Sequence, residues 1–231
     1  MSLLRKVSRS SWMLALPMAA ALGLTPTSAR ACGGEWYPAL MEREPDQRPR
    51  LIPMAEKALE QGRPIAAAGI VVRVIPHIRS LKAESSPIVA RAMRVLAVAL
   101  ARGDGSLSLE REVPDYAQGS WLGKSASARS GNLHWAVSAL SAVSQDKKDD
   151  PALRTELGEA MARLPEFREQ ARATLEQLAT RDLIASPEGY ATLARLRAQS
   201  GDSAGEKLAL TRCKAMAKSA DLCAAPSVSA S

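Results

Sequence analysis

The sequence predicts an all-α protein built from pairs of short amphipathic helices. Apolar residues recur at spacings of three and four along several stretches, so they project from one face of a helix. Hydrophobic residues make up 46% of the chain but aromatic residues only 3%, so Ala, Leu, Val and Met must fill the core. This composition favours close packing of helix on helix over a sheet, and we find no convincing segment of period two.

Residues 1–31 have the pattern of a secretory signal peptide. Three basic residues precede an apolar run at 12–24, and the stretch ends in a small-residue A-x-A pattern at 29–31. The run is about 13 residues long, shorter than the roughly 20 residues that a membrane-spanning helix needs. We therefore expect export, to the periplasm or out of the cell, with cleavage between Ala31 and Cys32.

Cys32 would then be the first residue of the mature chain, which leaves a lipoprotein as an alternative. An acylated Cys32 would tether the protein to a membrane and give it a structural role in the envelope. The charged Arg30 departs from the small or apolar residues that usually precede a lipidated cysteine. Soluble export is the preferred interpretation, and we expect membrane association only if Cys32 is lipidated.

The charge balance does not indicate nucleic-acid binding. The chain has 31 basic and 24 acidic residues and a formal net charge of +7 at pH 7. Four basic residues and no acidic residue lie in the segment 1–31, so the mature chain would keep 27 basic residues and a net charge of +3. Such a small excess gives little attraction to a polyanion, and we expect no nucleic acid among the partners.

The first half of the mature chain contains three expected helices. An irregular lead-in is expected at 32–49, followed by helices at about 51–61 and at 64–74, separated by Gly62. A third helix is expected at 87–102. Residues 104–130 contain several Gly and Pro residues, and there we expect an irregular insertion or a degenerate hairpin in place of the partner of the third helix.

The second half resumes the helical pattern. Helices are expected at about 131–144, from Pro151 to about Met161 and after Pro165, and a final pair is expected at 187–217 with a turn at Gly201. The tail 224–231 is expected to be disordered. The second helix of the final pair has two neighbouring rows of small or apolar residues, which we expect to form its buried face: Ala204, Leu208 and Ala215, and Ala209 and Cys213.

The final pair resembles a tetratricopeptide repeat (TPR), and 51–75 resembles a second copy. Tyr190, Leu193 and Ala194 stand where the first helix of this repeat carries an aromatic residue, a Leu and a small residue. The copies are degenerate, since Glu206 stands where a small residue is usual. The resemblance implies an α-solenoid of about four helix pairs over 50–223, with an extended concave surface that binds a protein or a peptide.

The sequence contains no motif that indicates catalysis. His77 and His134 are too few for a multi-histidine metal site, and there is no P-loop, dinucleotide fingerprint or nucleophile elbow. We expect no enzyme activity, no cofactor and no metal. The alternative is an enzyme, or an enzyme subunit, with its site in 104–130, where acidic residues and a tyrosine gather: Asp104, Glu110, Glu112, Asp115 and Tyr116.

Cys213 and Cys223 are expected to form a disulfide. Ten residues of continuous helix would separate them by about 15 Å, whereas a disulfide needs Cα atoms within about 7 Å. If the helix ends near Lys218, the turn-forming residues at 219–221 allow the chain to fold back. An exported protein is in a compartment where the bond persists. Two unpaired thiols are the alternative.

The function that these features favour is that of an exported, non-catalytic scaffold in the cell envelope. Residues 63–102 hold seven Lys or Arg residues against Glu84 as the only acid, so an acidic partner is expected there. The alternative is that these basic residues bind no partner and only keep two apolar helices soluble. The expected partner-binding residues are Arg73, Arg79, Arg91 and Arg94.

Overall fold

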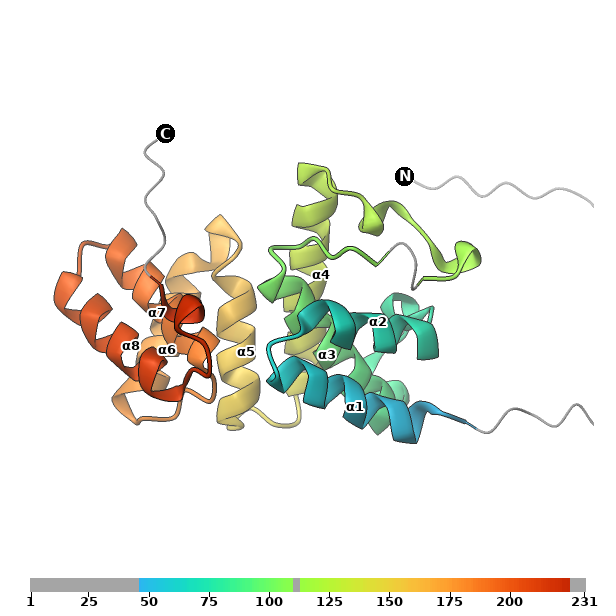
Figure 1. Cartoon of the computed structure of the whole chain (residues 1–231), viewed down its shortest axis with the longest axis horizontal. Coiled ribbons are helices and arrows are strands. Elements are labelled where there is room, and N and C mark those ends of the chain that lie inside the picture. The colour runs from blue at the N-terminus through green and yellow to red at the C-terminus, as the bar shows by residue number, and fades with distance from the viewer. Residues whose placement is uncertain (1–45, 110–112, 225–231) are drawn as a thin grey trace, which may run out of the picture. The chain divides into compact units, whose positions relative to one another are not determined.

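The described part of the chain is helical throughout. A computed structural model describes residues 46–109 and 113–224, and in these ranges it has α-helices, turns and short 3-10 segments, with no β-strand. The expected all-α fold is therefore confirmed (Figure 1). The helices are α1 (Arg48–Glu60), α2 (Pro64–Val74), α3 (Pro87–Arg102), α4 (Ala126–Ser144), α5 (Pro151–Met161), α6 (Arg168–Thr180), α7 (Pro187–Gln199) and α8 (Ser203–Met216).

Several expectations fall on residues outside this description. They are the signal peptide at 1–31 with its cleavage between Ala31 and Cys32, the part of the lead-in before residue 46, and the tail after residue 224. They stay predictions.

The helix starts follow local sequence signals. Proline occupies the first or second position of α1, α2, α3, α5 and α7, where its missing N–H breaks no helical hydrogen bond. At the starts of α3, α4, α5, α7 and α8, a side chain accepts a hydrogen bond from a backbone N–H of the first turn. The residues that cap in this way are Ser86, Ser125, Asp150, Ser186 and Asp202.

Glycine makes the turns of the first and last helix pairs. Gly62, between α1 and α2, has φ +71°, and Gly201, between α7 and α8, has φ +80°. Glycine adopts this left-handed conformation at no steric cost because it has no Cβ. The turns therefore lie where the sequence predicts them.

Each helix packs against the next one along the chain, which gives four antiparallel pairs. The odd-numbered helices also contact one another in order, α1 with α3, α3 with α5 and α5 with α7. No comparable contact joins the even-numbered helices within the described residues. α1, α3 and α5 thus each lie beside their own partner and beside the first helix of the next pair (Figure 1).

The core consists of two clusters that meet between α4 and α5. One is formed largely by α1 to α4, the other by α5 to α8, and Val137 and Leu157 pack against both. α5 and α7 approach closely, since a Cβ added to Gly189 would lie 2.5 Å from Cγ2 of Thr155. Glycine at position 189 is therefore needed for this contact.

The partner of α3 is α4, which an irregular insertion separates from α3, as one of the two alternatives for 104–130 expects; only the end of that segment, 126–130, is helical. An irregular segment with two 3-10 turns, Asp115–Ala117 and Ser120–Leu122, follows α3, and α4 then packs along α3. α4 begins at Ala126, not near residue 131, because the Ser125 side chain caps it by accepting a hydrogen bond from the N–H of Ala128.

Only one of the two expected rows on α8 is buried. Ala209 and Cys213 are 2% and 0% exposed, but Leu208 is 60% exposed, and Ala204 and Ala215 are also exposed. Since α8 is the last α-helix of the described chain, no later helix covers this face.

Candidate binding groove

The odd-numbered helices line one groove of about 920 Å³. The C-terminal strap, which we define as residues 217–224, and Met216 form another wall. The volume lies in the range of about 300–1,000 Å³ that is typical of ligand sites. Lining residues from the four helices are Leu59 on α1, Arg94 and Val95 on α3, Thr155 and Glu156 on α5, and Glu188 on α7.

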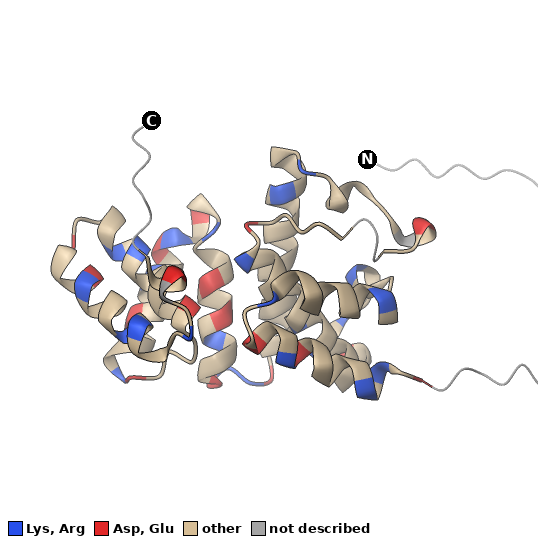
Figure 2. Ribbon diagram, viewed as in Figure 1, with Lys and Arg blue, Asp and Glu red and all other residues tan. Residues whose placement is uncertain are grey.

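Ion pairs connect these helices along the groove. Glu56 on α1 pairs with Arg91 on α3, where Nε of Arg91 lies 2.8 Å from Oε1 of Glu56. Arg94 on α3 makes a two-pronged contact with Glu156 on α5, with N–O distances of 2.6 and 2.7 Å. Acidic residues mark successive turns of α5 in Figure 2, so α5 supplies negative charge to a basic face of α3.

Arg102 joins three odd-numbered helices at the end of α3. Its Nε lies 3.1 Å from Oε2 of Glu159 on α5, and its Nη1 lies 3.1 Å from Oε1 of Glu188 on α7. Glu159 also accepts a hydrogen bond from the hydroxyl of Ser186, the cap of α7. Burial raises the pKa of Glu159, although Arg102 and Ser186 oppose that change. Burial lowers the pKa of Arg102, but the nearby glutamates outweigh it and the net shift is upward.

The structure does not bring the four predicted binding arginines together as one free surface. Arg91 and Arg94 face the carboxylates of Glu56 and Glu156, and Arg73 is exposed on α2. Residues 63–102 include only one acidic residue, because the acids that pair with these arginines lie outside this range, on α1 and α5. The binding role of the four arginines stays a prediction, and two of them are engaged in ion pairs between helices.

Arg79, the fourth, is held between two tryptophan rings. Its Cζ lies 5.1 Å from the ring centroid of Trp121 and 5.0 Å from that of Trp135. Its Nη1 donates to Oδ1 of Asn132, and Nδ2 of Asn132 donates to the carbonyls of Gly105 and Trp121 at 2.8 and 2.7 Å. Burial lowers the pKa of Arg79 to about 10, so the group stays charged at neutral pH.

This cluster fastens the 104–125 segment to α4 through cation–π contacts and hydrogen bonds. Sequence reasoning did not find it. The four residues lie as far apart as 79 and 135, and a lone tryptophan in a loop gives no signal of its partner.

The residues named for the alternative enzyme site do not form a described cluster. Oδ1 of Asp104 lies 3.9 Å from Nη1 of Arg163, and the Asp104 side chain is 63% exposed. Tyr116 is 73% exposed and its ring lies at a tilt to that of His77, with 5.6 Å between ring centroids, and Asp115 is exposed. Glu110 and Glu112 lie outside the described residues. Among the described residues, no three His, Cys, Asp or Glu side chains come together in a way that could hold a metal ion.

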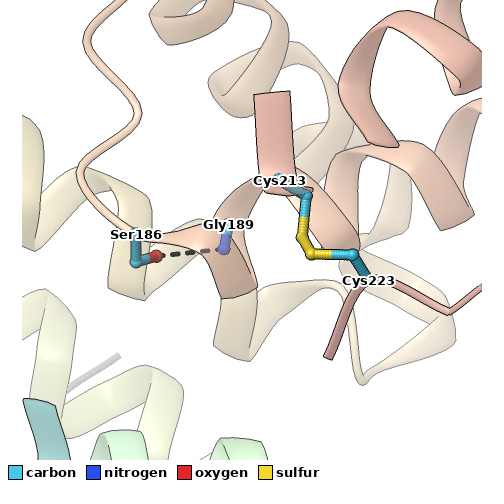
Figure 3. The surroundings of a disulfide bond; sticks show 4 residues. All are labelled: Ser186, Gly189, Cys213 and Cys223. Carbon is cyan, nitrogen blue, oxygen red and sulfur yellow. Dashed lines mark hydrogen bonds between the residues drawn. A yellow bond between two sulfur atoms is a disulfide. The ribbon is translucent and has the colours of Figure 1, made fainter. Parts of the chain in front are cut away.

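The Cys213–Cys223 disulfide is confirmed. The two sulfur atoms lie 1.98 Å apart and the Cα atoms 5.9 Å apart. α8 ends at Met216, and a 3-10 turn at Ala220–Cys223 returns the chain to the side of α7. Figure 3 shows the bond near the start of α7, where the Gly189 N–H donates to Oγ of Ser186 at 3.0 Å. The bond therefore fixes the strap that forms one wall of the groove.

Comparisons with known protein families, with curated proteins and with solved structures found no match. None of the described helices is long and apolar enough to span a membrane. The groove and its charges therefore carry the functional argument.

Proposed function

We propose that this protein is an exported, non-catalytic helical-repeat scaffold whose groove binds a segment of another protein or a peptide in the cell envelope. The observation that carries the proposal is that α1, α3, α5 and α7 all contribute to the same groove. A repeat array that presents the equivalent helix of every pair to one side forms an extended binding surface without catalytic residues.

A TPR-like α-solenoid is the architecture we propose for the four pairs. Its support is the order of contacts, in which each helix packs on the next and each odd-numbered helix packs on the following odd-numbered one. Neighbour-only packing of this kind is typical of stacked repeats. The resemblance of 187–217 to a TPR points to the same arrangement.

The groove suits a peptide that carries both apolar and charged side chains. Leu59, Val95 and Met216 give it apolar surface, and the ion pairs of Arg94 and Arg102 give it polar partners. Such mixed lining is common where a few polar groups fix the orientation of a mostly apolar ligand.

Export is supported by the signal pattern at 1–31 and by the disulfide, since such bonds persist in oxidising compartments. We expect mass spectrometry of protein from the envelope to give a mature chain that begins at Cys32. An acyl group on Cys32 would establish the lipoprotein alternative, and an intact Met1 segment would rule out cleavage.

A capture experiment with a filled groove tests the binding role. Ala152→Trp places a large side chain in the groove, and Ala198→Trp makes the same change at an exposed position of α7 outside it. The proposal predicts that wild type and Ala198→Trp retain the same specific partner from native envelope extract and that Ala152→Trp loses it. Equal retention by all three folded proteins would contradict binding in the groove.

A further inference from the structure

A second, smaller cavity of about 210 Å³ adjoins the groove. Gly62, Arg102, Glu188 and Leu222 belong to the walls of both. The remaining walls come from the start of α2, the ends of α3 and α5, and the middle of α7. Arg163 and Arg195 also line this cavity, and we call it the arginine pocket.

The three arginines of the pocket differ in how far their charge is compensated. Arg102 forms ion pairs with Glu159 and Glu188, with an N–O distance of 3.1 Å in each. Arg163 has Asp104 at 3.9 Å, a distance beyond that of a hydrogen bond, and the Asp104 side chain is largely exposed. Arg195 has no hydrogen bond or ion pair within the described residues, although it is half-buried.

The charge of Arg195 is only partly compensated by the side chains around it. Burial lowers its pKa, the positive charge of Arg163 lowers it further, and Asp104 opposes both effects. The guanidinium groups of Arg163 and Arg195 repel each other, and Asp104 offsets this repulsion only in part. The two other carboxylates of the cavity, Glu159 and Glu188, are paired with Arg102. Half-burial strengthens the repulsion because water screens it less. An anion between them would remove the imbalance.

We propose that the arginine pocket binds an oxyanion group, a carboxylate or a phosphate, through Arg163 and Arg195. A guanidinium presents paired N–H donors that match the oxygens of either group. The volume is large enough to admit such a group, and Pro64, Ala101 and Ala191 form apolar walls. The inference does not depend on peptide binding in the groove, since a free anion would serve equally.

Thermal unfolding in a buffer of low ionic strength tests the pocket with inorganic phosphate and with acetate as probes. A ligand that binds only the folded state raises its melting temperature in a saturable way. We expect saturable stabilisation of the wild type by phosphate, and weaker stabilisation by acetate because it carries less charge. Sodium chloride at matched ionic strength should not reproduce the effect.

Variants locate the site. Arg163→Gln and Arg195→Gln should each weaken apparent phosphate affinity about tenfold or more, since a hydrogen bond to a charged group is lost. Arg181→Gln, at an exposed position at the end of α6, is the matched control and should respond as the wild type does. Without anion, Arg195→Gln should melt at the same temperature as the wild type or higher, because it removes an uncompensated charge.

Phosphate stabilisation that survives in both pocket variants, or that sodium chloride reproduces, would overturn the proposal. Arg195→Lys is a conservative variant that should stay folded. It keeps the positive charge but loses the paired N–H donors of the guanidinium group. Intermediate phosphate affinity is expected for it, and full wild-type affinity would contradict paired recognition. Saturation by phosphate without any response to acetate would assign the pocket to phosphate groups. A preference for acetate would assign it to carboxylates.

Discussion

Individual residues connect the helix pairs through buried charge. Glu159 of α5 is 3% exposed and contacts both Arg102 at the end of α3 and Ser186 at the start of α7. A buried carboxylate is costly to desolvate. The guanidinium of Arg102 and the hydroxyl of Ser186 offset part of this cost by donating hydrogen bonds to Glu159. Removal of the carboxylate would leave Arg102 with Glu188 as its remaining close partner.

Glu159→Ala is therefore expected to lower the free energy of unfolding by about 2 kcal/mol, because it removes buried hydrogen bonds to Arg102 and Ser186 while Glu188 still pairs with Arg102. Glu159→Gln should cost less, since its amide oxygen can still accept from Arg102 and its NH2 group can donate to the hydroxyl oxygen of Ser186. The matched control is Glu169→Ala, which removes an 85% exposed partner of Arg172 and should cost under about 0.5 kcal/mol. Urea unfolding measures all three, and equal losses for Glu159→Ala and Glu169→Ala would contradict the role of Glu159.

Among the elements, the C-terminal strap is distinctive because a covalent bond holds it. Cys213 and Cys223 are 0% and 1% exposed, and the 3-10 turn between the strap's ends packs on α7 and α8. Leu222 of the strap lines both the groove and the arginine pocket. The position of the strap thus helps to shape both cavities.

Reduction of the disulfide is expected to release the strap without unfolding the first two helix pairs. A closed loop of this length is worth about 3 kcal/mol in a chain-entropy estimate, and its loss falls on a short segment that packs mainly on α7 and α8 among the described α-helices. Hydrogen exchange with and without reductant should show faster exchange at 217–224 and little change in α3. Unchanged protection of the strap after complete reduction would show that packing alone holds it.

Most element boundaries could be predicted because their signals are local. Pro64 starts α2 and Pro87 starts α3, as the sequence indicates. Gly62 follows the end of α1 and Gly201 follows the end of α7, also as the sequence indicates. The start of α4 was missed, because Gly131 resembled a boundary although it lies inside the helix. The expectation that both rows of α8 are buried was wrong for the row of Leu208, because both rows have helical spacing and no later helix of the described chain covers Leu208.

The candidate site was harder to predict, since it depends on residues that meet across helices. The predicted basic surface counted charges along one stretch of chain, while Glu56 and Glu156 reach it from α1 and α5. The Cys213–Cys223 bond could be predicted because both partners and the turn between them lie within eleven residues of sequence.

For the molecule as a whole, the central claim is that four helix pairs stack so that their odd-numbered helices form one groove. The most direct test uses the Arg94–Glu156 contact, which joins the second pair to the third. A wrong stacking order would separate α3 from α5, and the two side chains could not interact.

A double-mutant cycle in urea unfolding measures this interaction with Arg94→Ala, Glu156→Ala and the double variant. The account predicts a coupling of about 1–2 kcal/mol, because the contact is two-pronged and Glu156 is nearly buried. Additive single effects, with a coupling below about 0.3 kcal/mol, would contradict the packing of α3 on α5 and the groove built on it.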